Sequence, residues 1–233
     1  MSLLGVLSDA HGNVDAFDRC IQVLRGLGAT EFVFIGDSIG YIPSAEVVGR
    51  LMALDDRVRC VMGNHEALLL RGEIDEDRDR VYQLTRIGKM LSDSQIRFLA
   101  AWPTMLQTKL GRYHVTFVHG SPVDPTYGYV YPDTDLTPFG SPADYFFMGN
   151  SHRPFVRWSN DCCFINVGSC GLPRDDGSYG AAATFNDQTG AVEVYRFDIE
   201  AANDRLLHQT QALHASVIAV MLRRSKEIYG THV

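Results

Sequence analysis

The sequence lacks any long uninterrupted apolar segment. No part of the 233 residues approaches the roughly eighteen apolar residues that a membrane-spanning helix requires. Residues 1–7 are apolar but short and have no basic flank, so we expect a buried strand there rather than a secretory signal. We therefore expect a cytoplasmic protein with no membrane partner.

An excess of basic residues is also absent. The chain has 21 Lys and Arg against 28 Asp and Glu, and its net charge is -7. Without a basic excess, counterions along a nucleic-acid backbone are not displaced, which excludes a general nucleic-acid-binding surface. A small phosphorylated substrate stays compatible with this charge, because bound metal cations invert the local field. No pattern in the sequence indicates an oligomeric state.

Cysteines are few and show no CxxC spacing. Their odd number predicts reduced, partly buried thiols in a cytosolic protein rather than a disulfide framework. Two of them are adjacent and would face opposite sides of a strand, so they would not ligate one ion. The five are Cys20, Cys60, Cys162, Cys163 and Cys170.

Strands and helices alternate in the first third of the chain. Apolar runs at 3–8, 31–35 and 57–62 predict buried strands, and helical periodicity at 14–27 and 45–54 predicts two helices between them. This βαβαβ order is typical of a parallel sheet with crossover helices, and therefore of an α/β protein.

The rest of the chain adds helices, further strands and one long loop. We expect a charged helical insertion at about 66–101, a C-terminal helix at about 200–229, and one domain over 1–233. Ser92 and Gln95 form a capping-box pattern. The loop at 120–144 carries five prolines and three tyrosines, and we expect an ordered wall or lid. Further strands are expected at 105–109, 113–118, 145–148, 164–167, 181–185 and 192–197, the last two joined as a hairpin.

Residue types that ligate metals follow five of the expected strands. In open α/β sheets, ligands bind in the crevice beyond the carboxyl ends of the strands. Each residue also has an ordinary interpretation: an N-cap for Asp9, turn residues for Asp37 and Asn64, hydrogen-bonded structural residues for the histidines. A single metal site explains all five strand ends together. Its candidate residues are Asp9, His11, Asp37, Asn64, His65, His119, Asn150 and His152.

The chain resembles the calcineurin-like metallophosphoesterases in five segments that occur in the order of that family's motifs. Together with Gly168-Ser169-Cys170-Gly171, the resemblance spans about residues 3–172, and Gly40-Tyr41-Ile42-Pro43 is similar to the small bacterial and archaeal branch. Five motifs in order are far more specific than one. The five are Asp9-Ala10-His11-Gly12-Asn13, Gly36-Asp37, Gly63-Asn64-His65-Glu66, Val118-His119-Gly120 and Gly149-Asn150-Ser151-His152.

This resemblance implies a four-layer α/β/β/α sandwich of two mixed β-sheets flanked by helices, with a two-metal site at the strand ends. It implies that one ion takes Asp9, His11 and His152, and that Asp37 bridges both ions. The second ion would take Asn64, His119 and the residue at position 150. His65 would not be a ligand; it would face the phosphate and act as the general acid.

Such a site suits the hydrolysis of phosphomonoesters or phosphodiesters. Two divalent ions ~3.5–4 Å apart neutralise the phosphate and lower the pKa of a shared water, so that metal-bound hydroxide is the nucleophile. Protonation of the leaving oxygen by His65 would contribute about 10²–10⁴ in rate. Mixed oxygen and nitrogen donors favour manganese, with iron or zinc as alternatives.

One position departs from the family pattern, which is Gly-His-x-His at the segment containing Asn150. An amide oxygen is a weaker donor than imidazole for borderline-soft ions, so we expect the second metal site to be the weaker one. We also expect Asn64, His65 and Arg153 to contact the small phosphorylated substrate, although Arg153 is equally compatible with a surface ion pair.

These motifs do not identify the physiological substrate. The alternatives are a nucleotide or dinucleotide polyphosphate hydrolase, a protein phosphatase, or a weakly catalytic phosphate-binding regulatory protein. Only Asn150 favours the last of these, and the retention of His65 counts against it.

Overall fold

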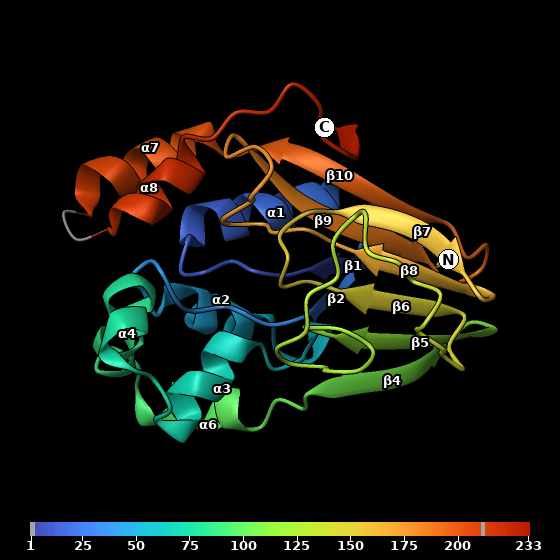
Figure 1. The fold of residues 1–233 in the computed structure, drawn as a ribbon, viewed down its shortest axis with the longest axis horizontal. Coiled ribbons are helices and arrows are strands. Elements are labelled where there is room, and N and C mark those ends of the chain that lie inside the picture. The colour runs from blue at the N-terminus through green and yellow to red at the C-terminus, as the bar shows by residue number, and fades with distance from the viewer. Residues whose placement is uncertain (1–2, 211–212) are drawn as a thin grey trace.

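The computed structural model describes residues 3–210 and 213–233, which form two facing β-sheets with helices around them (Figure 1). The first sheet has the order β11-β10-β9-β1-β2-β3 and the second has the order β4-β5-β6-β8-β7. Both sheets contain parallel and antiparallel pairs, so both are mixed. The expected α/β fold of two mixed sheets flanked by helices is confirmed.

The strands of the first sheet are β1 (Leu3–Leu7), β2 (Glu31–Phe34), β3 (Val58–Cys60), β9 (Tyr179–Asn186), β10 (Val192–Asp198) and β11 (Thr231–His232). Those of the second sheet are β4 (Met105–Leu110), β5 (Tyr113–Val118), β6 (Tyr145–Met148), β7 (Phe155–Ser159) and β8 (Cys162–Asn166). The helices are α1 (Val14–Gly26), α2 (Glu46–Leu54), α3 (Asn64–Arg71), α4 (Glu76–Tyr82), α5 (Leu84–Gly88), α6 (Asp93–Ala100), α7 (Glu200–Gln209) and α8 (Ala215–Met221), with a 3₁₀ turn at Asp55–Arg57.

The alternation of side chains along each strand divides the core into layers. On β2, Val33 packs between the two sheets, whereas Phe32 and Phe34 pack against the helices on the other side. On β8, Cys163 lies between the sheets and Cys162 on the outer face, as expected for adjacent strand residues. The apolar runs in the sequence are therefore strands that are buried on both faces.

The segment between β5 and β6 covers the outer face of the second sheet. It contains no helix or strand over residues 119–144. Val130 and Leu136 are fully buried there against Phe146 and Phe164. The loop expected from the prolines and tyrosines is thus an ordered part of the core.

Two sequence expectations about the C-terminal half are wrong. The helix expected at 200–229 is broken: α7 ends at Gln209, and α8 begins anew at Ala215, after His214 accepts a hydrogen bond from the backbone N–H of Ser216 as a helix cap. Residues 211–212 of that expected helix lie outside the described residues. The edge strand β7 was not expected, because its alternating sequence is short and follows a proline.

The helical segment after β3 consists of four short helices rather than longer ones. Gly72 and Gln83 adopt left-handed conformations that end α3 and α4. The capping box of Ser92 and Gln95 is confirmed at the start of α6. No helix of the described residues is long and apolar enough to cross a lipid bilayer.

Candidate metal centre

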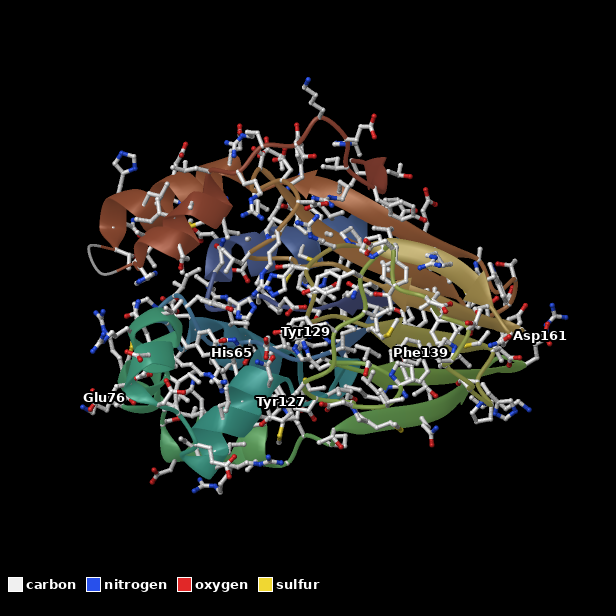
Figure 2. The ribbon with its side chains drawn as sticks, in the orientation of Figure 1. His65, Glu76, Tyr127, Tyr129, Phe139 and Asp161 are labelled. Atoms are coloured by element: carbon white, nitrogen blue, oxygen red, sulfur yellow. The ribbon has the colours of Figure 1, made fainter. Side chains whose placement is uncertain are left out.

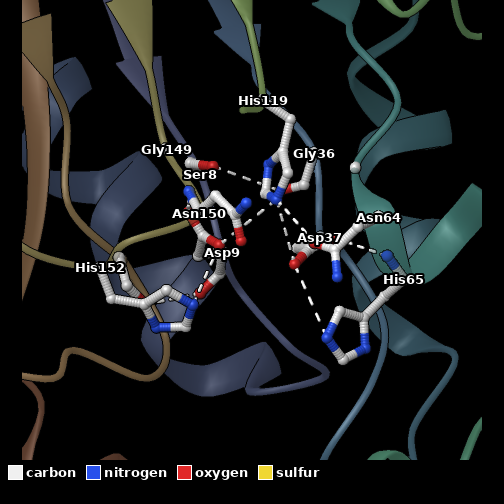
Figure 3. A network of polar contacts seen from close by, with 12 residues as sticks. Ser8, Asp9, Gly36, Asp37, Asn64, His65, His119, Gly149, Asn150 and His152 are labelled. Atoms are coloured by element: carbon white, nitrogen blue, oxygen red, sulfur yellow. Dashed lines mark hydrogen bonds and ion pairs between the residues drawn. The ribbon is translucent and has the colours of Figure 1, made fainter. Parts of the chain in front are cut away.

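The candidate residues follow the carboxyl ends of five strands, most of them on loops and Asn64 and His65 in the first turn of α3. Asp9 and His11 follow β1, Asp37 follows β2, His119 follows β5, and Asn64 opens α3 after β3. Asn150 and His152 follow β6. The first sheet therefore supplies one half of the cluster and the second sheet supplies the other, and Figure 3 shows their side chains converging on one space.

The backbone at this cluster is held in an uncommon conformation. Asp9, His11, Asp37, Asn150 and His152 have positive φ angles of 56°, 48°, 60°, 60° and 56°. Left-handed conformations cost free energy in residues other than glycine, and they persist where the surrounding structure enforces them. Their concentration at five candidate ligands indicates that the fold is arranged around this site.

Asp9, His11 and His152 form the first group of close polar atoms. Asp9 Oδ1 lies 3.1 Å from His152 Nε2 and 3.6 Å from His11 Nε2. The two Nε2 atoms lie 3.1 Å apart. All three side chains are buried, and Asp9 Oδ1 has no hydrogen-bond partner. Potential ligand atoms of these residues lie within 4.8 Å of one another, which suits one metal ion.

Asp37, Asn64 and His119 form the second group. His119 Nε2 lies 3.3 Å from Asp37 Oδ2 and 3.0 Å from Asn64 Oδ1. Asp37 Oδ2 is also 3.7 Å from His11 Nε2 in the first group. The Asp37 carboxylate therefore lies between the two groups, in the position that a bridging ligand occupies.

The histidines of both groups are oriented by backbone carbonyls. Nδ1 of His11, His119 and His152 lies 3.1, 2.7 and 2.5 Å from the carbonyl oxygens of Ile39, Ile35 and Leu172, respectively. Since a carbonyl oxygen only accepts, each Nδ1 donates its hydrogen, and Nε2 is the atom that faces the carboxylates. Metal-ligating histidines are characteristically oriented in this way.

The charges of the cluster depend on one another. Burial raises the pKa of Asp9, but His152 and His119 outweigh it and hold that pKa well below its usual value. Burial likewise raises the pKa of Asp37, and His119 and His65 outweigh it. Burial lowers the pKa of His119, whereas Asp37 and Asp9 raise it to about 10. The carboxylates of Asp9 and Asp37 are thus both ionised. The proton on His119 compensates part of their negative charge, and a bound divalent cation would take over this role.

His65 lies beside the two groups with its ring between tyrosines. The ring centroids of Tyr41 and Tyr82 are 4.9 and 4.4 Å from that of His65. His65 Nε2 is 3.9 Å from Asp37 Oδ2, and Nδ1 has no hydrogen-bond partner. Burial lowers the pKa of His65 to about 3 although Asp37 opposes the shift. Potential ligand atoms of His11, Asp37 and His65 also lie within 4.8 Å of one another, so the role of His65 as an acid rather than a ligand stays a prediction.

Asn150 contacts the site through its backbone and the long loop through its side chain. Its backbone N–H donates to Asp9 Oδ2 at 3.1 Å. Its side-chain Nδ2 donates to the Gly128 carbonyl oxygen at 2.9 Å. The amide oxygen of Asn150 is therefore the side-chain atom that could contact an ion, and the same residue ties the 119–144 loop to the site.

Arg153 is exposed, unlike the other candidates. It lines a surface hollow with Tyr131, Pro132 and Asp133. In the part of the chain that the structure describes, no hydrogen bond or ion pair joins Arg153 to the buried cluster. Its contact with substrate stays a prediction.

Sequence reasoning missed two residues that the structure brings to the site. Glu66 is fully buried and accepts hydrogen bonds from the backbone N–H groups of Asp37 (2.9 Å), Ser38 (2.7 Å) and Gly63 (3.0 Å). It thereby holds the loop of the bridging carboxylate, and its place in the Gly63-Asn64-His65-Glu66 segment was the signal. The second is Arg174, whose guanidinium donates to the Tyr41 hydroxyl at 3.0 Å. It lies just beyond the Gly168-Ser169-Cys170-Gly171 segment, which was the only signal for it.

Comparisons with known proteins agree with this geometry. The calcineurin-like phosphoesterase superfamily domain matches residues 1–188. An uncharacterized protein of Methanocaldococcus jannaschii is 26% identical over 229 residues, covering 88% of this chain and 92% of that protein. A hypothetical protein of Pyrococcus horikoshii has a TM-score of 0.80 at 20% identity, covering 97% of this chain and 100% of that one. A metallophosphoesterase of Sphaerobacter thermophilus has a TM-score of 0.76 at 21% identity, covering 94% and 98%.

Proposed function

The chain belongs to the calcineurin-like phosphoesterase superfamily, and from this premise we propose that it hydrolyses phosphomonoesters or phosphodiesters with two divalent metal ions. The observation that carries the proposal is the buried Asp9 Oδ1, which has no hydrogen-bond partner and faces the Nε2 atoms of His11 and His152. A lone carboxylate oxygen among imidazole nitrogens in a dry site fits a cation, because an unpaired buried charge is otherwise costly.

The residues have separate roles in this proposal. Asp9, His11 and His152 would hold one ion, and Asn64, His119 and Asn150 the other. Asp37, whose Oδ2 lies 3.7 Å from His11 Nε2 and 3.3 Å from His119 Nε2, would bridge the two. When bound, the ions would neutralise the phosphate and lower the pKa of water. The backbone carbonyls behind the histidines keep the Nε2 atoms aimed inward, so the site needs little rearrangement to bind metal.

His65 would protonate the leaving oxygen. Its ring is fixed between Tyr41 and Tyr82, which limits its rotation, and its Nδ1 makes no competing hydrogen bond. Gly40 makes room for this ring, since a Cβ at that position would collide with it. A positioned general acid of this kind contributes about 10²–10⁴ in rate.

We further propose manganese as the preferred metal, with a weaker second site at Asn150, and the cytoplasm as the location. Mixed carboxylate, amide and imidazole donors support manganese, with iron or zinc as alternatives. The five cysteines are all free thiols, which supports a reducing compartment. The partner we propose is a small phosphorylated substrate. Asn150 is the one feature that favours a second candidate, a weakly catalytic phosphate-binding protein.

A metal-dependence assay with a His65 variant tests this proposal. The chelated protein should lose hydrolysis of an aryl phosphate and an aryl phosphodiester, and manganese should restore it. His65→Ala should keep its manganese while kcat falls about 10²–10⁴-fold, and less for an activated aryl leaving group. His208→Ala is the matched control, because His208 is exposed and its ring bonds only within its own helix.

Three results would contradict the proposal. Full activity after exhaustive chelation would exclude metal-dependent hydrolysis. Loss of a metal in His65→Ala would make His65 a ligand instead of an acid. Tight phosphate binding without turnover in any metal would favour the phosphate-binding candidate.

A further inference from the structure

Arg174 is a partly buried cation for which the described residues provide no ion pair. Its guanidinium Nη2 donates to the Tyr41 hydroxyl at 3.0 Å. Among the ion pairs of residues 3–210 and 213–233, none includes this side chain. Burying an arginine without an acidic partner is costly, and proteins accept that cost chiefly where the cation meets an anionic ligand.

The segment that carries Arg174 is fixed on several sides. Its backbone N–H donates to the His152 carbonyl oxygen at 3.4 Å, and its own carbonyl accepts from Arg223 Nη1 at 2.7 Å. The next residue, Asp175, pairs with the fully buried Arg196 through contacts of 2.6 and 3.0 Å. The guanidinium is thus presented from a rigid base, as a binding residue requires.

Arg174 lies at the rim of the metal centre. The carbonyl oxygen of Leu172, two residues before it, accepts a hydrogen bond from His152 Nδ1. Tyr41, which binds the guanidinium, packs its ring 4.7 Å from that of His11 and 4.9 Å from that of His65.

Four tyrosines from three segments of the chain lie further along this rim. Tyr41 and Tyr82 contact each other with ring centroids 5.1 Å apart. On the long loop, the rings of Tyr129 and Tyr131 are parallel within 8°, with centroids 6.0 Å apart. These two side chains are 45% and 40% exposed, so they present aromatic surface to solvent.

The hydrogen bond from Asn150 to Gly128 anchors the tyrosine pair next to the metal centre. Figure 2 labels Tyr129 on the loop and His65 at the start of α3, and in this view both project onto the central part of the molecule. The Arg174 guanidinium, bonded to Tyr41, and the tyrosine pair next to Gly128 therefore both flank the candidate metal centre.

We propose that Arg174 binds anionic phosphate oxygens of the substrate, that Tyr129 and Tyr131 stack on an aromatic ring of it, and that the substrates are nucleotides. The inference rests on the proposed function, whose site it extends. Guanidinium pairs with phosphate oxygens in a fork geometry, and aromatic side chains stack on any nucleobase. Tyr41 is a positioning residue, which keeps the guanidinium at the rim.

Adenosine 5′-monophosphate and ribose 5-phosphate are the matched probes, since they differ only by the base. The full chain with manganese should bind the nucleotide about tenfold more tightly in titration calorimetry and show a similar preference in kcat/KM. Tyr129→Ala with Tyr131→Ala should remove this preference through KM. Arg174→Ala should weaken both probes about 10- to 100-fold, and Arg174→Lys less. Tyr41→Phe should reproduce part of the Arg174→Ala loss while leaving the ring in place.

Arg97→Ala is the control, because Arg97 is exposed on α6 and makes no side-chain contact with the site. Equal affinity for the two probes, or Arg174 variants that bind both as wild type does while thermal unfolding is unchanged, would overturn the inference. Nucleotide binding that depends on Arg174 but has no turnover would refute only the proposed hydrolysis. Turnover without preference for the base would refute only the nucleotide subsite.

Discussion

At the scale of single residues, Asn150 contacts both the long loop and the candidate metal centre, and a histidine at this position would make these contacts through different atoms. Its amide nitrogen binds the Gly128 carbonyl at 2.9 Å, and its backbone N–H binds Asp9 at 3.1 Å. Only the amide oxygen is left for an ion, and amide oxygen is a weaker ligand than imidazole nitrogen for borderline-soft metals. In the proposed site, Asn150 would therefore bind a metal less tightly than a histidine would, but its side chain attaches the tyrosine-bearing loop.

Replacing Asn150 by His should strengthen the second metal site. We expect a lower manganese concentration for half-maximal occupancy, by about tenfold, because the imidazole adds a better donor. Calorimetric titration of the metal-free protein measures this. Asn160→His is the matched control, since Asn160 also donates its amide to a loop carbonyl, that of Thr137 at 3.0 Å, but lies on the surface. Two equally tight sites in both wild type and Asn150→His would show that no such asymmetry exists.

Glu66 holds the loop of Asp37, the carboxylate that would bridge the two proposed ions. It accepts hydrogen bonds from the backbone of Asp37, Ser38 and Gly63, and from the Ser38 hydroxyl at 2.8 Å. Glu66→Gln places an amide N–H₂ against these donors. We expect a loss of about 1–3 kcal/mol in the free energy of unfolding and of about 10- to 100-fold in metal affinity.

Thermal unfolding and manganese titration measure the two effects of Glu66→Gln. Glu73→Gln serves as control, because Glu73 is exposed and only 3.9 Å from Arg71 in a surface pair. A variant that unfolds earlier but binds manganese as wild type does would restrict Glu66 to a structural role.

At the scale of elements, the loop over 119–144 has both buried and exposed side chains. Val130 and Leu136 pack on the second sheet, while Tyr129 and Tyr131 stay partly exposed beside the metal centre. Gly128 directly precedes Tyr129, and its carbonyl oxygen accepts the hydrogen bond from Asn150. A Cβ there would collide with Ser121 and approach the Asp124 carbonyl oxygen to 2.8 Å.

Gly128→Ala should displace the tyrosine pair more than it disturbs the ligands. We expect the ratio of kcat/KM for adenosine 5′-monophosphate over ribose 5-phosphate to fall about fivefold, while manganese affinity changes less. Gly140→Ala in the same loop is the control, since a Cβ there meets no atom within 4 Å. An unchanged substrate ratio in Gly128→Ala would make the loop a covering of the core and nothing more.

At the scale of the whole molecule, the proposed ions would connect the two sheets. Asp9, His11, Asp37 and Asn64 come from strands of the first sheet, and His119, Asn150 and His152 come from the second. Without a cation, the two buried carboxylates are stabilised by nearby histidines and by one backbone N–H each, that of Asn150 for Asp9 and that of His65 for Asp37. Metal binding should therefore stabilise the packing of the sheets as well as enable chemistry.

Manganese should raise the melting temperature of the protein. At a concentration 100-fold above Kd, one ion adds about 2.7 kcal/mol, which corresponds to about 5–10 °C for a domain of this size. Calorimetric melting with manganese and with chelator measures the shift. Asp37→Asn should lose most of it, because Asp37 lies between both ligand groups. Identical melting temperatures with and without manganese would contradict an ion shared by the two sheets.

The sequence by itself determined the strands of both sheets apart from the edge strands β7 and β11, and the strand ends that carry ligand residues. Apolar runs such as those of β1, β2 and β6 are long enough to specify strands locally, and a ligand next to a strand end needs only the direction of the chain to be placed. The Ser92 cap was readable for the same reason, since its partner Gln95 is three residues away.

Only the tertiary structure decided which arginine borders the site and where the last helix breaks. Arg153 is adjacent to His152 in sequence but is exposed, whereas Arg174 reaches the rim through Tyr41, which is 133 positions away. The helix expected at 200–229 breaks because His214 caps a new helix and because Ser225 and Arg223 bind the backbone and side chains of 174–177. Side-chain direction and contacts between distant segments depend on how the layers pack, and no local pattern of residues encodes that packing.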